Sequence, residues 1–367
     1  MTQDFEEESN SSLNPESPKK KSSFWKILLL FTAFGLIAGA GFGWSFYQKI
    51  YAPNVTDNNG QAHDLLIPTG ATYDQVKGIL KGKGILKDVE AFDWVAKQMN
   101  YPNKIYPGRY VVKSGWGNRT LVTKLRRGEQ EPLNIIVNNI RTKAQLIDLV
   151  ESQLEADSTE LVNLLNDDAY LRSKGFDKES VMAVFISDTY QYNWNTSAEQ
   201  YFERALKEYK KFWSNERKVK ADKLKFTPIE VTSLAAIVEE EAAKNDEMPR
   251  IAGVYVNRLK TPGWRLDADP TLKFALGNFE LKRILDIHKE VDSPYNTYKN
   301  DGLPPGPIRI PSKIALDAVL NAEAHEYMFF CAKEDFSGYH NFAKSYSTHI
   351  LNAKRYQKAL NERKIFK

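Results

Sequence analysis

The chain has 367 residues, and its 51 lysines and arginines against 47 aspartates and glutamates give a formal net charge of +4. Hydrophobic residues make up 42% and charged residues 27%, which excludes a wholly disordered chain, a collagen and a polytopic membrane protein. So small a positive excess argues against a dedicated nucleic-acid-binding protein. The single cysteine, Cys331, excludes an internal disulfide and a thiolate zinc cluster. The length corresponds to roughly two to three domains.

Residues 1–26 are predicted to be a disordered tail, because they are polar and rich in Ser, Asn, Pro and Glu. Residues 27–47 carry no charge, and 21 residues of helix span about 31 Å, the thickness of a bilayer core. A signal peptide has a shorter apolar region and a small-residue cleavage site, and a buried core helix is the other alternative. We therefore predict a single transmembrane helix.

The lysines at positions 19–21 precede this run, so the tail is expected in the cytoplasm. In a bacterium the protein would lie in the inner, cytoplasmic membrane, with everything after the helix outside the cytoplasm. ATP and NAD chemistry is not expected there, and no cofactor is predicted.

A linker is expected at 48–60, and a small module of strands and helices at 61–130. Its expected elements, in chain order, are a strand at 65–68, a helix capped by Thr72, a helix at 89–96, a strand that begins at Arg109 and a short helix at 121–128. The module resembles a LysM-like subdomain, a fold associated with binding glycan chains. A docking module without a ligand is the alternative. Residues 131–367 read as mixed helices and strands, so the expected fold class is α+β. A strand is expected at 135–137, and amphipathic helices are expected at 144–154, 160–165 and 198–212.

A strong helix start occurs at Thr227, followed by Pro228 and by Glu230 three positions after the cap. This helix reaches three adjacent carboxylates at positions 239–241, which point in different directions because successive residues turn by about 100°. On the helical wheel Glu241 lies within the apolar arc and Glu239 at its border. Glu240 faces away and is predicted to be solvated.

Burial of Glu239 or Glu241 would raise the carboxyl pKa, as a general acid working near neutral pH requires. A solvated acidic helix end is the alternative interpretation. Two small residues, Ala235 and Ala236, flank Glu239 on the wheel and would leave room beside it for a bulky ligand.

Six ordered motifs carry a family resemblance: residues 234–241 (LAAIVEEE), 248–259 (MPRIAGVYVNRL), 269–271 (DPT), 294–298 (PYNTY), 302–308 (GLPPGPI) and 338–342 (GYHNF). Together they are similar to the MltG (YceG-like) family of endolytic murein transglycosylases, over about residues 60–360. The resemblance implies one N-terminal membrane span, a LysM-like subdomain at 61–130 and a catalytic domain at 131–367.

The resemblance makes Glu239 the catalytic residue, whereas the wheel alone would favour Glu241. The chain departs from the family pattern at Glu240, where a lysine is common, at 265–269, and at 310–312, where Ile-Pro-Ser replaces Asn-Pro-Gly. These departures leave the acid in place but affect the expected sugar contacts near Asp267.

The implied enzyme is a lyase that cuts the β-1,4 bond between N-acetylmuramic acid and N-acetylglucosamine of nascent glycan strands, leaving 1,6-anhydromuramoyl ends and ending strand elongation. Glu239 would protonate the leaving oxygen and then accept the proton of the attacking C6 hydroxyl. A muramidase would instead need a second carboxylate. Asp267, Asp269 and Glu241 are available, so that alternative stays open.

The candidate substrate-binding residues are Asp269, Asn296, Tyr298, His340 and Glu241. Ordinary turn chemistry is the alternative for Asp269 and Asn296, and a structural role for His340. His340 and His349 lack a third ligand at metal spacing, so no metal site is predicted. The expected partners are peptidoglycan strands, membrane lipid around the single span and cell-wall synthases, without nucleic acid. A non-catalytic, membrane-anchored peptidoglycan-binding scaffold is the competing function.

Overall fold

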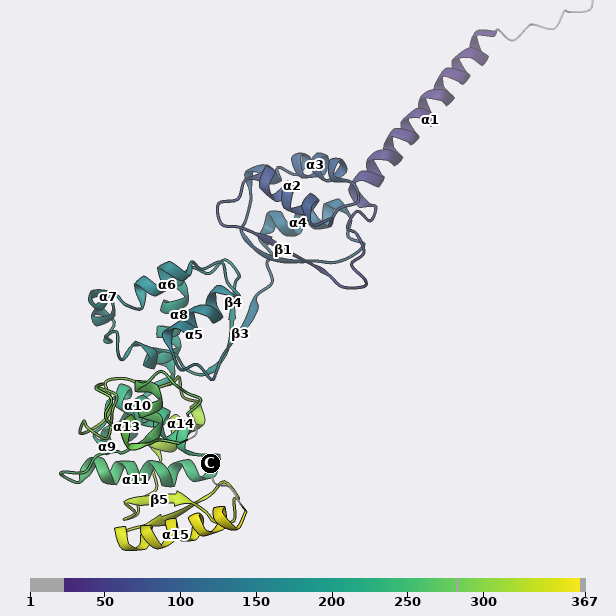
Figure 1. Cartoon of the computed structure of the whole chain (residues 1–367). Coiled ribbons are helices and arrows are strands. Elements are labelled where there is room, and N and C mark those ends of the chain that lie inside the picture. Colours follow the sequence, from purple (N-terminus) through teal and green to yellow (C-terminus); the bar gives the residue numbers. More distant parts are fainter. Residues whose placement is uncertain (1–22, 282, 364–367) are drawn as a thin grey trace, which may run out of the picture. The chain divides into compact units, whose positions relative to one another are not determined.

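The computed structural model describes residues 23–281 and 283–363. Most of the predicted N-terminal tail therefore lies outside the described residues. The chain divides into two compact units. The first contains residues 23–65, 72–105 and 111–127, and the second contains 66–71, 106–110 and the described residues from 128 onward. Helices dominate both units, and short strands make the fold a mixed one, which confirms the α+β prediction (Figure 1).

The first helix, α1 (Ser23–Tyr51), has 29 residues. The most apolar 18-residue window within Phe24–Tyr51 has a mean hydropathy of 1.9, and none of that window is buried in the protein. The helix is therefore long and apolar enough to cross a membrane, and it contains the whole predicted span at 27–47.

The small module that follows contains the predicted elements in the predicted order: β1 (His63–Ile67), α2 (Tyr73–Gly82), α3 (Val89–Gln98), β2 (Gly108–Val112) and α4 (Asn118–Arg127), with a 3-10 turn at Tyr101–Asn103. Thr72 caps α2, as the sequence predicts, and Gln75 completes a capping box with it. The strands β1 and β2 form a two-stranded sheet, and Leu80, Phe92 and Leu125 are fully buried. Its likeness to LysM stays a prediction.

From residue 128 onward, the second unit first contains the antiparallel pair β3 (Leu133–Val137) and β4 (Asp188–Tyr192) and the helices that share a core with it. The helices are α5 (Lys143–Glu151), α6 (Ser158–Leu164), α7 (Asp168–Ser173) and α8 (Ala198–Phe212), with a 3-10 turn at Val181–Val184. The predicted helices at 144–154, 160–165 and 198–212 correspond to α5, α6 and α8. Their apolar faces form one core around Phe185 and Phe202.

A second core surrounds α10 (Pro228–Glu241), which packs against α11 (Met248–Lys260) and α14 (Lys313–Leu320) (Figure 1). Leu234, Ile237 and Val238 of α10 are fully buried in it, because the apolar positions of the helix face two neighbours rather than one. This packing fixes where the carboxylates at the end of α10 point.

The remaining elements of the second unit are α9 (Asn215–Leu224), α12 (Asp269–Ala275), α13 (Asp286–Lys289), β5 (Phe329–Ala332), β6 (His340–Ala343) and α15 (Tyr346–Glu362), with a 3-10 turn at Asn245–Glu247. The strands β5 and β6 pair antiparallel, and α15 lies against both (Figure 1).

Candidate active site

The helix α10 brings three carboxylates to its C-terminal end. Thr227 caps its start by accepting from the Glu230 amide while Glu230 accepts from the Thr227 amide, and Pro228 occupies the first turn. This is the start that the sequence predicts. Because the register of the helix is fixed from this cap and by its buried face, residues 239–241 project in three different directions.

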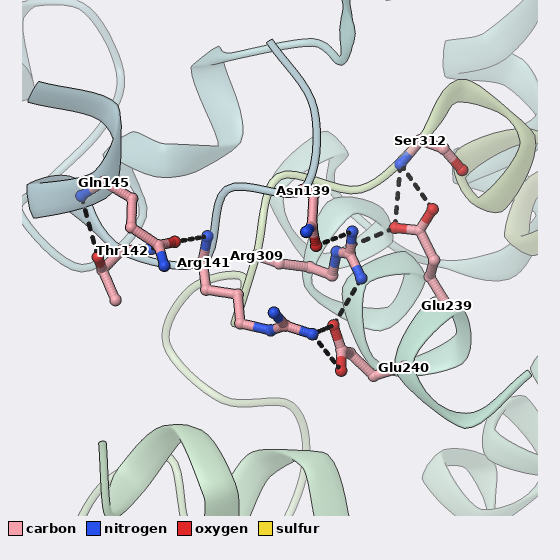
Figure 2. Close-up of polar contacts among 8 residues, drawn as sticks. All are labelled: Asn139, Arg141, Thr142, Gln145, Glu239, Glu240, Arg309 and Ser312. Carbon is pink, nitrogen blue, oxygen red and sulfur yellow. Dashed lines mark hydrogen bonds and ion pairs between the residues drawn. The ribbon is translucent and has the colours of Figure 1, made fainter. Parts of the chain in front are cut away.

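Glu239 projects toward the start of α14. Both of its carboxyl oxygens lie within hydrogen-bond distance of the Ser312 amide nitrogen, at 3.3 and 3.1 Å (Figure 2). Arg309 Nε lies 3.2 Å from Oε2 as an ion pair, and the Glu239 side chain is 15% exposed. The carboxyl is therefore held by a backbone donor and a cation, and part of it still reaches solvent.

Arg309 joins two neighbouring carboxylates. Besides its contact with Glu239, its Nη1 lies 2.5 Å from Glu240 Oε1. Arg141 approaches the same Glu240 carboxyl, with Nη2 at 2.8 and 3.1 Å from its two oxygens (Figure 2). A planar guanidinium suits such a site because it can serve two oxygens at fixed angles.

The prediction that Glu240 is solvated is wrong. Its side chain is only 18% exposed and contacts two arginines from distant parts of the chain. The helical wheel placed it correctly on the side away from the α10 core, but the segments around Arg141 and Arg309 cover that side. A wheel describes one helix and contains no information about which loops pack over its polar face.

Ser312 serves the site with its backbone and its own helix with its side chain. It is the N-cap of α14, and its Oγ accepts from the Ala315 amide at 3.2 Å. Its amide is thereby directed away from α14 and toward Glu239. The start of a helix also carries partial positive charge, which favours a carboxylate nearby.

Glu241 points into the protein, as its place within the apolar arc predicts. The Tyr255 hydroxyl donates to its Oε1 at 3.1 Å. Burial, with a smaller contribution from the negative charge of Asp269, raises the pKa of the Glu241 carboxyl to about 7. Burial likewise raises the pKa of Tyr255 well above its ordinary value. Glu241 as a whole is half-buried, so part of its surface still reaches solvent.

Asp269 and Tyr298 lie together beside this buried pair. The Tyr298 hydroxyl donates to Asp269 Oδ1 at 2.6 Å, and Asp269 is the first residue of α12. Burial and the Asp269 carboxylate raise the pKa of Tyr298 far above its usual range. Glu241, Tyr255, Asp269 and Tyr298 thus form one cluster of two carboxyl groups and two phenols.

Asn296 is fully buried, and its side chain is occupied by the turn that contains it. Its Nδ2 donates to the Lys289 and Val291 carbonyls at 2.8 Å each, and its Oδ1 accepts from the Tyr298 amide at 3.0 Å. These contacts are the turn chemistry that the sequence offered as the alternative, and through the last of them Asn296 positions Tyr298. A direct contact of Asn296 with substrate stays a prediction.

His340 lies on β6 and faces a buried acid. Its Nδ1 is 2.6 Å from Glu247 Oε2, and its backbone amide donates to Glu247 Oε1 at 2.9 Å. The Glu247 residue is 5% exposed, so this pair is part of the packing between β6 and the turn before α11. These are the contacts of a structural histidine, and a place for His340 in a glycan cleft stays a prediction.

Three contributors to the site were not predicted: Arg141, Arg309 and Ser312. The two latter residues follow directly after the 302–308 motif, and the Ile-Pro-Ser departure at 310–312 marks the same place. That motif was the one available signal. Arg141 carried no signal in the sequence, because it precedes an ordinary capped helix, α5.

The surface beside this start of α14 is hollowed into a pocket of about 240 Å³. Among its lining residues are Lys313, Asp188, Lys211 and Arg217. Lys313 directly follows Ser312 in the chain and pairs with Asp188. Within residues 23–281 and 283–363, no three His, Cys, Asp or Glu side chains gather in a way that could hold a metal ion.

Known proteins are similar to this chain in sequence or structure over most of its length. An endolytic murein transglycosylase of Bacillus subtilis is 27% identical over 347 residues, which is 89% of this chain and 93% of the relative. One of Streptococcus pneumoniae is 26% identical over 339 residues, 83% of this chain and 60% of that longer protein.

The crystal structure of a YceG-like protein from Listeria monocytogenes superimposes with a TM-score of 0.53 at 26% identity, covering 79% of this chain and 98% of that one. Residues 65–355 match the model of the YceG-like family, which includes every residue of the site described above. The chain therefore belongs to the YceG-like family.

Proposed function

We propose that this protein is a membrane-anchored lytic transglycosylase that cuts peptidoglycan strands, with Glu239 as its acid and base. The names of its relatives support a peptidoglycan transglycosylase. The observation that carries the choice of residue is the place of Glu239, a partly exposed carboxyl at the end of a buried helix. Its two neighbours are engaged elsewhere, Glu240 with two arginines and Glu241 with Tyr255.

The reaction needs one carboxyl group used twice. Glu239 donates its proton to the glycosidic oxygen as the bond from that oxygen to C1 of the muramoyl residue breaks. The C6 hydroxyl of the same sugar then bonds to C1, and its proton passes to the Glu239 carboxylate. The products are a 1,6-anhydromuramoyl end and a free hydroxyl on the leaving sugar, with no water consumed.

An intramolecular nucleophile explains how a single acid can suffice, because a well-oriented internal group can lower a barrier by about 7–11 kcal/mol. Arg309 and the Ser312 amide contact the Glu239 carboxyl and fix its direction. Glu240 and Arg141 in turn hold Arg309 in place. We assign these residues to positioning and Glu239 to the chemistry.

The cluster of Glu241, Asp269 and Tyr298 is our candidate for holding sugar hydroxyl or N-acetyl groups. It combines donors and acceptors in one place, and the Tyr298–Asp269 hydrogen bond fixes the orientation of both. Because the buried Glu241 carboxyl has a pKa of about 7, it carries a proton in part of the population at neutral pH and can donate as well as accept.

The deciding experiment uses the full chain in detergent with purified glycan strands, and mass spectrometry of the products. We expect anhydromuramoyl ends from the wild type and a fall of roughly 10²–10⁴-fold in Glu239→Gln, which cannot donate the proton. Glu216→Gln is the matched control, since it makes the same chemical change at a 79% exposed position on α9. Equal product from Glu239→Gln and the control would remove Glu239 as the acid.

The same protein and glycan strands distinguish two other functions from the proposed one. A muramidase incorporates solvent oxygen, so ¹⁸O in the new reducing end would show hydrolysis in place of the lyase reaction. A scaffold binds strands without releasing any product, and Glu239→Gln would then behave like the wild type in every measurement. We expect the variant to bind strands normally while product formation is lost.

We further propose that α1 is the single membrane span, with the N-terminus in the cytoplasm and the catalytic unit outside. The support is the length and hydropathy of α1 together with the lysines that precede it. Protease added outside intact cells should then digest the chain from residue 52 onward but leave its N-terminal end protected.

A further inference from the structure

The C-terminal end of α1 is joined to the small module by side-chain contacts. The Phe46 ring packs against Trp94 of α3 with centroids 5.3 Å apart. Arg119 of α4 donates to the Tyr51 hydroxyl at 2.8 Å and lies over that ring, 5.6 Å from its centroid. Helices α3 and α4 both contact α1, and all of these residues belong to one compact unit (Figure 1).

Buried hydrogen bonds make this joint tight. Asn118, 1% exposed, donates from Nδ2 to the Lys49 carbonyl at 2.8 Å, and its Oδ1 accepts from Asn54 at 2.7 Å. The backbone of Gly117 comes so close that an added Cβ would lie 2.6 Å from the Tyr51 carbonyl oxygen. The module therefore begins where α1 ends, without a flexible spacer between them.

The joint lies at the edge of the uncharged span. The apolar run ends at Tyr47, and Lys49 is the first charge after it. Phe46, whose ring packs against Trp94, therefore still lies inside the run. Along the helix axis it is about 5 Å from the charged Lys49. If α1 crosses a bilayer, Trp94 must lie at the depth of the headgroup layer.

We propose that the face of the module next to α1 is a membrane-binding surface that sits in the phospholipid headgroup layer. We call this surface the collar and define it as Trp94 and Arg119 together with Phe46, Lys49 and Tyr51. The inference rests on α1 spanning the membrane, as proposed above. It assigns the module a lipid partner, whereas the sequence considered only glycan binding or simple docking.

The chemistry of the collar fits that partner. Tryptophan and tyrosine favour the membrane interface because one end of each ring system is apolar and the other donates a hydrogen bond. Trp94 is half-buried and Tyr51 is 48% exposed, so both keep surface available to lipid. Lys49 and Arg119 add two positive charges that can pair with lipid phosphates.

Intrinsic fluorescence of the full chain in phosphatidylcholine vesicles tests the collar. Trp25→Phe and Trp44→Phe first remove the tryptophans of α1 itself, both more than 60% exposed. Lipids brominated near the carbonyl end of their acyl chains then quench tryptophans that lie at shallow depth. We expect these lipids to quench the fluorescence of the Trp25→Phe, Trp44→Phe double variant. Adding Trp94→Phe to that variant should lower the quenching roughly twofold or more.

The control is Trp264→Phe, which removes a tryptophan of the other unit and should leave the quenching unchanged. Flotation of the vesicles in a density gradient shows whether the chain is bound to them. If the chain is bound but Trp94→Phe changes the quenching no more than Trp264→Phe does, the collar is refuted while the membrane span stands. If the chain is not bound at all, the membrane span itself is refuted. The two failures are therefore distinguishable.

A second pair of variants keeps Trp94 in place. Gly117→Ala, made in the same background, would force the joint apart, since its Cβ meets the backbone of Tyr51. Gly82→Ala is the matched control, because its Cβ meets nothing within 4 Å. We expect weaker quenching in Gly117→Ala alone, and equal quenching in both variants would show that the joint does not hold Trp94 at the membrane.

Discussion

Three adjacent glutamates at the end of α10 have three different environments. Glu239 contacts a cation and a backbone amide at the edge of solvent, Glu240 lies between two arginines, and the Glu241 carboxyl is buried against a tyrosine. The differences follow from helix geometry, since each step of about 100° turns the side chain toward another neighbour. One short acidic run can therefore supply an acid, an anchor for Arg309 and a group with a raised pKa.

The buried carboxyl of Glu241 should make stability depend on pH. Its pKa rises from an ordinary value of 4.5 to about 7 on folding, so the folded chain holds this proton more tightly than the unfolded chain. The stability due to this proton is complete below about pH 4.5 and is lost as the pH rises through 7. The loss amounts to about 3 kcal/mol at most.

We expect Glu241→Gln to flatten this pH dependence, because the amide keeps an acceptor for Tyr255 but has no proton to lose. Urea unfolding of the second unit between about pH 4.5 and pH 8 measures it. Glu216→Gln, at an exposed site, should retain the wild-type slope. An unchanged slope in Glu241→Gln would mean that its carboxyl is not buried in the way described.

At the scale of elements, α10 and α14 meet so that a helix start faces a helix end. Ser312 is the contact, and its two functions can be separated because its φ of −66° is one that proline adopts. Ser312→Ala removes the Oγ that caps α14 but keeps the amide that contacts Glu239. Ser312→Pro removes both.

We expect Ser312→Ala to lower stability by about 1 kcal/mol, as loss of a cap does, with most activity retained. Ser312→Pro should lower kcat roughly tenfold further, because Glu239 loses the hydrogen bond that orients its carboxyl group. Product formation and urea unfolding on both variants measure the two effects. Equal kcat values in the two variants would show that the amide does not contribute.

At the scale of the whole molecule, two units with separate cores should respond separately to core mutations. Leu125 is fully buried in the first unit and Leu234 in the second. Truncation of either to alanine should cost about 2–5 kcal/mol in its own unit. Hydrogen exchange should then rise in α4 for Leu125→Ala and in α10 for Leu234→Ala, and a rise in both helices from one variant would show that the units unfold together.

Much of the chain could be predicted from sequence because its signals are local. The apolar run of α1, the caps at Thr72 and Thr227 and the strands β1, β2 and β3 were found where their patterns placed them. The inward direction of Glu241 was also correct, since it depends only on the phase of one helix. Such features are set by residues within a few positions of one another.

The sequence by itself determined the mixed fold, the apolar helix and the acidic end of α10. Tertiary structure alone decided what surrounds those acids: Ser312 lies 73 positions from Glu239 and Arg141 lies 99 from Glu240. No local sequence pattern predicts such contacts, because they depend on how α10, α14 and the segments beside them pack. Glu240 was predicted to be solvated because only its own helix was considered. In the structure the segments around Arg141 and Arg309 cover it.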